Sequence, residues 1–467
     1  MDKKMPKLLS ELRKILQAPD GPARLIWAES DWPEDQRALS VDNFLGATMD
    51  EVRLFHANRC VEEILRPLDM DDANFFRIGV LRREITGSVS YPKHRDHSAH
   101  TLHNYLLGWY FVAHCPVLRE ALSSEFDHRR IPTKKRLFEE CFADIWPYVS
   151  LLHDVGYLFE GSLGLLSTAV QDSQIEIGAS VVDEYFASYF WNSIGFGSID
   201  DRRMALEFAN YQPPDFSHRS VAAISDHLRF LGQTDALLSF VKKSMKGLES
   251  LPTDAFDLWN EHYSYFDRIP MVQRLDAIRR VYERHYLQGL GSSGLRLLDH
   301  GVCGGLLLLL QVTFYFSLRC GLRKVKAEGP RQAQLCSRFE SGAVGYFQPS
   351  WWWSSLVWGC AATAIHNIQQ MDAWPSDYHA HQLTIEEDPL AYLGILVDCL
   401  EEWDRFTSSR DSVLSGVLPL QGKDVLLNRA AGRIVIDYRT KKSAEKVRRS
   451  LDTALRDWSI LVTVLPA

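Results

Sequence analysis

Hydrophobic side chains recur at helical spacing along most of the chain. Near the N-terminus, Leu8, Leu12 and Ile15 fall on one face of a helix over 7–16. The same period predicts further helices over 49–65, 95–113, 138–158, 295–322, 353–371 and 389–403. We therefore expect a mainly α fold, with a helical section at 1–90 and a helical domain at 91–410 that carries a helical insertion at about 163–294.

The pattern changes after about residue 408. Two short apolar runs at 424–427 and 432–438 predict strands, and 460–464 predicts a third. Between them, 443–458 has the apolar spacing of an amphipathic helix. These elements predict a small α/β appendage at 411–467.

One long apolar run, 301–316, is a candidate membrane span. Gln311 and Thr313 interrupt it and Arg319 follows it, so its uninterrupted part is shorter than the roughly 18 residues that a span requires. We therefore expect a helix buried in the protein core, and no membrane as a partner.

Charge and cysteine content narrow the class of protein. The net charge of −8 argues against nucleic acid as a partner, because phosphate backbones attract basic surfaces. The eight cysteines form no Cys-x-x-Cys pair, which is typical of reduced, buried thiols. The N-terminus shows no signal-peptide pattern. We expect a cytoplasmic protein.

Histidine and aspartate side chains stand in the apolar context of several predicted helices. His153 and Asp154 follow Leu151-Leu152, and Asp398 lies between Val397 and Leu400. A buried carboxylate requires a cation or a strong donor, and a metal ion would satisfy it. The candidate ligands are His100, His153, Asp154, His300, His366 and Asp398.

Each candidate ligand also has a structural interpretation. His153 and Asp154 together form a plausible capping pair, a single histidine is often a hydrogen-bonded core residue, and Asp398 could pair with Arg405. His97 and His103 lie on the same predicted helix as His100, and by helical geometry His103 is nearer the apolar face. The first ligand therefore stays open among these three histidines.

The order His, His-Asp, His, His, Asp on successive helices resembles the HD-domain superfamily of metal-dependent phosphohydrolases, in its version with six ligands and two metals. His100-Thr101-Leu102 is similar to the first motif, and 151–156 is similar to the motif that names the family. The resemblance covers about 95–405 in scattered blocks. It implies an HD-type helical bundle with the six candidate ligands around two metals.

The resemblance also implies a function. A phosphohydrolase of this kind would cleave a nucleotide or another phosphoester, with Asp154 and a hydroxide bridging the metals. The imidazole-rich ligand set favours two divalent transition metals, namely Mn, Fe, Co, Ni or Zn. Lys93, Arg95 and Arg405 are the nearest cationic residues that could bind substrate phosphate, and they could equally be solvated surface charges.

Other functions fit the same residues. The chain lacks the His-His pair and Gly-Tyr-Pro motif of the HD-GYP phosphodiesterases, which argues against cyclic dinucleotides as substrates. The ligand order is also similar to that of the di-iron oxygenases of this superfamily, such as myo-inositol oxygenase. A third alternative is a non-enzymatic module that binds a nucleotide or a partner protein. Trp351-Trp352-Trp353 could stack on a base or simply pack in the core.

Overall fold

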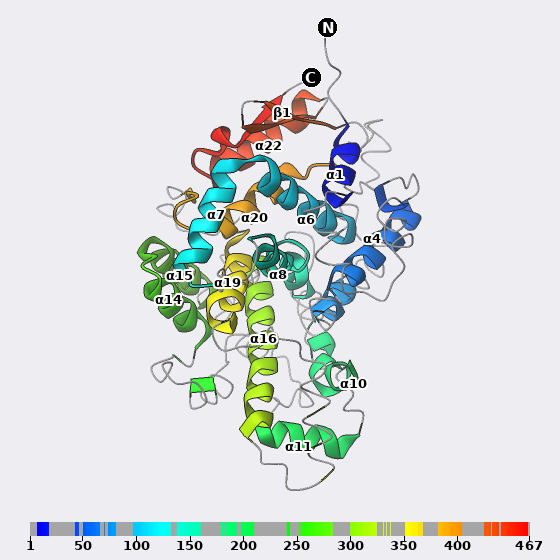
Figure 1. Ribbon diagram of the computed structural model, residues 1–467, viewed down its shortest axis with the longest axis vertical. Helices are drawn as coiled ribbons and strands as arrows, with labels where there is room; N and C mark the ends of the chain where they lie inside the picture. Colours follow the sequence, from blue (N-terminus) through cyan, green and yellow to red (C-terminus); the bar gives the residue numbers. More distant parts are fainter. Residues whose placement is uncertain are drawn as a thin grey trace, which may run out of the picture. The chain divides into compact units, whose positions relative to one another are not determined.

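The structure is a computed structural model, and it is mainly helical, as the sequence predicts (Figure 1). It describes residues 7–17, 43–45, 50–65, 70, 73–80, 97–131, 138–159, 178, 180–182, 184–193, 198–209, 241–242, 252, 254–283, 299–324, 330, 333, 337, 351–367, 382–403, 425–430, 432–438 and 440–465.

The chain divides into two compact units. The first unit comprises Met1–Leu68, Val80–His153 and Pro375–Ala467, and the second comprises Asp69–Gly79 and Asp154–Trp374. The predicted boundaries at 90 and 410 are not tested by this division and stay a prediction.

Helix α6 (His97–His114) is the central element of the first unit. The helices that pack against it are α1 (Leu8–Gln17), α4 (Asp50–Leu65), α7 (Pro116–His128), α8 (Phe138–Ser150) and α20 (Pro389–Leu400) (Figure 1). Gly108 permits a close approach of α8, because a Cβ atom at this position would lie 2.1 Å from the ring of Trp146. The indole Nε1 of Trp146 donates to the backbone oxygen of Tyr105 at 3.0 Å. Glycine and indole together hold α8 on α6.

Helix α20 begins at a buried cap. Pro389 occupies the first turn, and the Asp388 carboxylate accepts from the backbone N–H groups of Leu390 and Ala391 at 3.0 and 2.9 Å. Gly394 brings α20 close to α8, since a Cβ atom there would lie 2.5 Å from Val149 Cγ1. This packing sets the position of Asp398 near the end of α20.

Replacing Asp388 with alanine should therefore destabilise the protein. The loss of an N-cap side chain costs about 1 kcal/mol, and up to about 2 where the cap is well ordered. Urea unfolding of Asp388→Ala should show a reduced free energy of unfolding. Thr440→Ala, at the exposed N-cap of α22 (Lys441–Ala454), should show a smaller loss. An unchanged midpoint for Asp388→Ala would contradict the role of this cap.

The C-terminal residues form the α/β appendage that the sequence predicts. Strand β1 (Leu426–Ala430) pairs antiparallel with β2 (Arg433–Asp437), and β3 (Val462–Leu465) pairs parallel with β2 on its other side. The paired Leu427 and Ile436 are both buried, as are the paired Ile434 and Val462. Helix α22 packs against β3 and against α20, β1 contacts α1, and β2 contacts α6. The appendage therefore packs on other helices of the first unit, to which it belongs.

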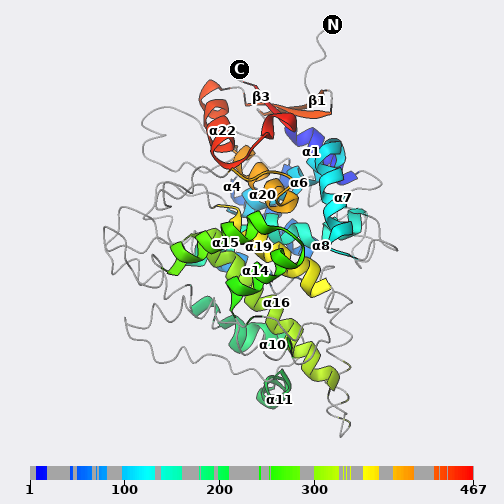
Figure 2. The same cartoon turned by 90° about the vertical axis from the view of Figure 1, so that its left-hand side faces the viewer.

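Helix α16 (His300–Lys324) is the longest helix described in the second unit. It packs against α19 (Val357–Ile365), α11 (Ile199–Ala209) and the π-helical turn η7 (Trp352–Leu356). A second pair of helices, α14 (Ala255–Tyr265) and α15 (Ile269–Val281), lies side by side (Figure 2). A short helical segment is formed by η3 (Tyr185–Tyr189) and α10 (Phe190–Ser193).

The apolar part of α16 is buried. Among the described helices, His300–Leu318 alone is long and apolar enough to cross a membrane, and all of it is buried inside the structure. Gly305 lets α19 approach closely, since a Cβ atom there would lie 2.6 Å from Ala364 Cβ. The prediction of a buried core helix agrees with this burial. The absence of a membrane partner stays a prediction.

The tryptophan run before α19 packs in the core. Trp351, Trp352 and Trp353 are all buried, and the Trp352 ring stacks on Phe316 with centroids 5.1 Å apart. The packing interpretation of this run is therefore favoured over base stacking.

The described cysteines whose side chains can be assessed are present as thiols. Cys60, Cys115, Cys141, Cys303 and Cys360 are buried, and Cys399 is half-buried. This agrees with the prediction of reduced thiols, and the cytoplasmic location stays a prediction.

Candidate metal centre

His153 and Asp154 lie in a short turn after α8. The sequence predicts one helix over 138–158, but α8 ends at Ser150 and the 3-10 turn η2 (His153–Leu158) follows. The change occurs because the Pro147 carbonyl accepts from the N–H groups of both Leu151 and Leu152, which ends the regular helical pattern. Nδ1 of His153 then contacts the Ser150 carbonyl oxygen at 2.7 Å.

Gly156 in this turn lies at a close approach of two backbone segments. A Cβ atom at Gly156 would lie 1.8 Å from the backbone oxygen of His300 and 2.5 Å from the nitrogen of Gly304. The Tyr157 ring stacks on the His300 ring, with centroids 3.9 Å apart and an angle of 12° between the planes. Only glycine therefore allows this turn to lie directly on the first turn of α16.

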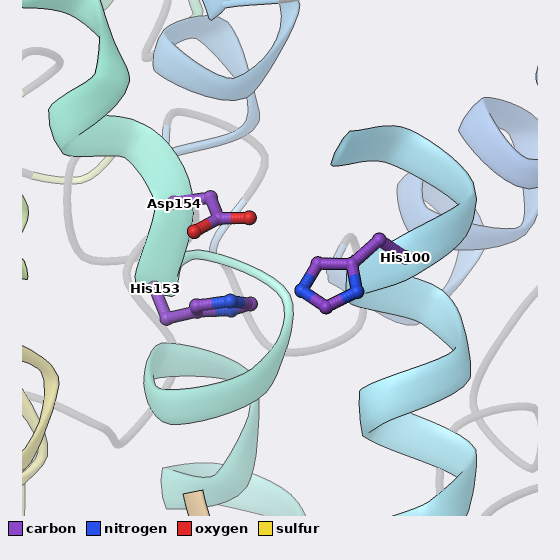
Figure 3. Close-up of side chains that lie close together, drawn as sticks. All are labelled: His100, His153 and Asp154. Carbon is purple, nitrogen blue, oxygen red and sulfur yellow. The ribbon is translucent and has the colours of Figure 1, made fainter. Parts of the chain in front are cut away.

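The first unit contains a cluster of buried donors, which we call the first donor group: His100 of α6, His153 of η2 and Asp398 of α20. Nε2 of His100 lies 2.9 Å from Oδ1 of Asp398, and Nε2 of His153 lies 3.8 Å from the same oxygen. The ring of His153 extends toward that of His100, with centroids 5.4 Å apart (Figure 3). The side chain of Asp154 projects from the next residue of the same turn.

Glu401 is a further carboxylate beside His100. Its Oε2 atom lies 2.7 Å from Nδ1 of His100, so the imidazole is held between two carboxylates. Burial alone would lower the pKa of His100, but the charges of Glu401 and Asp398 and their hydrogen bonds raise this pKa to about 9. The surroundings of this ring therefore favour a positive charge.

The second unit contains the second donor group: Asp154 of η2, His300 at the start of α16 and His366 after α19. One ligand atom from each of the three residues can be chosen so that all lie within 4.8 Å of one another, and all three residues are buried. Nε2 of His300 lies 3.2 Å from Nε2 of His366 and 3.6 Å from Oδ1 of Asp154. Nε2 of His366 lies 4.0 Å from that oxygen.

Neighbouring groups contact the other side of these rings. Nδ1 of His366 lies 2.7 Å from the Thr363 carbonyl oxygen, and Nδ1 of His300 lies 3.4 Å from Nδ2 of Asn367. Nδ2 of Asn367 donates to Asp299 at 2.8 Å. Asp299 also accepts from the N–H of Val302 at 2.8 Å, so it contacts both the first turn of α16 and the Asn367 side chain that lies beside His300. In both donor groups the Nε2 atoms face the carboxylate.

These residues fit divalent transition metals. Two ligands at about 2.1 Å from one ion lie roughly 3.0–3.4 Å apart, and the donor separations of 2.9–4.0 Å span and slightly exceed this range. Each group offers two imidazoles and one carboxylate, which is a three-ligand set found in catalytic sites with open coordination positions. Contacts at Nδ1 are the usual outer partners of metal-binding histidines. The buried cluster of Asp154, His300 and His366 could therefore hold a metal ion. The separations of His100 and His153 from Asp398 fit a metal ion as well.

The predicted ligands thus fall into two groups of three, one in each unit. His103 is buried beside Glu401, with Nδ1 at 3.6 Å from Oε1, and its ring contacts Phe44 and Trp403. The described atoms therefore favour His100 over His103 as the first ligand. Three further predicted residues, Lys93, Arg95 and Arg405, lie outside the described residues, and so does the side chain of His97.

Sequence reasoning missed Glu401 and Asn367. Glu401 comes three residues after Asp398, and Asn367 directly follows His366. Both positions place a hydrogen-bonding side chain near a candidate ligand, which is the signal that could have found them.

The resemblance to the HD-domain superfamily rests on the order of the six residues and on two short motifs. Comparisons with known protein families, with curated proteins and with solved structures found no match. The chemistry of the two donor groups is therefore the basis for a functional proposal.

Proposed function

We propose that this protein is a metal-dependent phosphohydrolase in which each donor group binds one divalent transition metal. The observation that carries the proposal is the repeated arrangement of two imidazole Nε2 atoms facing one buried carboxylate. Because consecutive residues, His153 and Asp154, belong to the two groups, we propose that both metals act on the same substrate. A nucleotide or another phosphoester is the proposed substrate class.

The residues of the chain have distinct tasks in this proposal. When bound, two such metals would supply a hydroxide at neutral pH and neutralise charge on the phosphoryl oxygens. Asp154 and Asp398 provide the negative charge that retains the cations, and Asp154 is the proposed catalytic residue. The contacts at Nδ1 of His153 and His366 hold each ring with Nε2 toward the carboxylate.

The ligand chemistry also favours one second candidate. Two histidines and one carboxylate with open positions are the ligand set of non-haem Fe(II) oxygenases. An oxygenase built on the same six residues would need molecular oxygen for turnover, whereas a hydrolase would not. Oxygen dependence therefore separates the two candidates.

The test is a metal and substrate screen of the full chain. The protein is loaded with Mn²⁺ or Fe²⁺ and incubated with bis(p-nitrophenyl) phosphate and with nucleotides, in air and under anaerobic conditions. Hydrolysis without oxygen supports the phosphohydrolase, and turnover that requires oxygen supports the oxygenase. Metal binding without any turnover would support a non-enzymatic module instead.

Chelation should destabilise the protein as well as stop turnover. A ligand that binds only the folded state at about 100 times its Kd contributes roughly 2.7 kcal/mol of stability. Treatment with EDTA should therefore lower the thermal unfolding midpoint, and Mn²⁺ should restore it where Ca²⁺ at the same concentration does not. A midpoint that is unchanged by EDTA and by Mn²⁺ would contradict bound metals.

A further inference from the structure

We propose that the C-terminal appendage, formed by β1, β2, α22 and β3, positions Glu401 and thereby sets the metal affinity of the first donor group. The inference rests on the metal binding proposed above and assigns a role to a part of the chain in which the sequence shows no catalytic chemistry. Glu401 is a positioning residue in this inference, because it acts through His100.

The first step is the contact of Glu401 with the histidines of α6. Its Oε2 atom lies 2.7 Å from Nδ1 of His100, and its Oε1 atom lies 3.6 Å from Nδ1 of His103. Glu401 is 1 % exposed, and its N–H donates to the Val397 carbonyl at 3.0 Å. A buried carboxylate on the outer nitrogen fixes the ring orientation and raises the basicity of a ligand histidine. A displacement of Glu401 would therefore displace the ligand atom of His100.

The second step is a pair of anchors on either side of Glu401. The phenol Oη of Tyr438, directly after β2, donates to the carbonyl oxygen of Leu400 at 2.6 Å. Nζ of Lys446, on α22, donates to both carboxylate oxygens of Glu402 at 2.6 and 2.7 Å. The appendage thus holds the residue before Glu401 and the residue after it.

The two anchors differ in strength. Tyr438 and Leu400 are both fully buried, so their hydrogen bond is protected from water. The Lys446 side chain is 50 % exposed, and ion pairs at such positions contribute little. The hydrogen bond of Tyr438 is therefore the contact that should transmit the position of the appendage to Glu401.

A purely structural role is the competing interpretation, and the chain offers a matched control for it. Oη of Tyr392 donates to the carbonyl oxygen of Arg456 at 2.9 Å, so this bond also joins α20 to the C-terminal residues. Tyr392 is likewise buried, but it lies near the start of α20, whereas Asp398 and Glu401 lie near its end. Each of the two substitutions, Tyr392→Phe and Tyr438→Phe, removes one phenol hydroxyl group. The first hydroxyl bonds near the start of α20 and the second bonds to its last residue.

The experiment measures Co²⁺ binding to the full-length variants by visible absorption, together with their thermal unfolding. Glu401→Gln should lower the Co²⁺ affinity by about 10- to 100-fold, the usual effect of losing an outer partner, and should shift the absorption bands. Tyr438→Phe should lower the affinity by about twofold to tenfold, as the loss of one hydrogen bond allows. Tyr392→Phe, which removes a partly buried bond, should lose somewhat less stability and keep the wild-type affinity and spectrum.

Equal Co²⁺ affinity in Tyr438→Phe and Tyr392→Phe would overturn the inference, as would an unchanged affinity in Glu401→Gln. If Glu401→Gln does not fold, the comparison of the two tyrosine variants still decides. Failure of the wild-type protein to bind Co²⁺ would overturn the proposed function and, with it, this inference. Co²⁺ binding that no variant alters leaves the proposed function standing and removes only the role of the appendage.

Discussion

Replacing Asp154 with asparagine should remove metal from the second donor group and abolish metal-dependent hydrolysis. The amide keeps the shape of the side chain but loses the negative charge that faces Nε2 of His300 and His366. Removing a ligand should weaken binding more than removing an outer partner, which costs about 10- to 100-fold. Metal analysis after gel filtration should therefore give about one equivalent or less per chain, against about two in the wild type.

Asp144→Asn is the control for this substitution. Asp144 is a buried carboxylate of α8 that belongs to neither donor group. This variant should keep the wild-type metal content and turnover. Equal metal content in Asp154→Asn and the wild type would show that Asp154 is not a ligand.

Replacing Gly156 with alanine should destabilise the protein by about 3 kcal/mol, at the upper end of the usual range for overpacking. The added methyl group would lie 1.8 Å from the His300 oxygen and 2.5 Å from the Gly304 nitrogen, and both are backbone atoms of α16 that cannot rotate away. The turn that carries Asp154 must then move from the helix that carries His300. Urea unfolding should show the loss of stability, and metal content should fall with it.

Gly432→Ala provides the comparison. No atom of the described residues lies within 4 Å of a Cβ at Gly432, but its φ of +76° is strained for alanine and should cost about 1–2 kcal/mol. Gly156→Ala should therefore be the more destabilised variant, and Gly432→Ala should keep its metal. A Gly156→Ala protein with wild-type stability would contradict the close contact between η2 and α16.

The helices could be predicted from the sequence because local spacing determines them. The prediction over 95–113 corresponds to α6 (His97–His114), and the predicted strands and helix of the C-terminal residues are all present. Helix ends were less predictable: the split of 138–158 into α8 and η2 depends on how the Pro147 carbonyl is shared. Spacing alone does not contain that information.

The partners of the ligands could not be predicted, because they come from distant parts of the chain. Glu401 is separated from His100 by 301 residues, and Asn367 contacts Asp299 across 68 residues. The helical position of His103 favoured it over His100, yet both side chains are buried. The different distances of the two rings from Glu401, 2.7 Å for His100 and 3.6 Å for His103, arise only when α20 packs on α6.

Anomalous diffraction from crystals of the Mn²⁺- or Co²⁺-loaded protein, recorded at the absorption edge of the metal, tests the central claim most directly. The account predicts one peak among His100, His153 and Asp398 and another among Asp154, His300 and His366. Peaks at other residues only, or no peak in a protein that is otherwise folded, would contradict it.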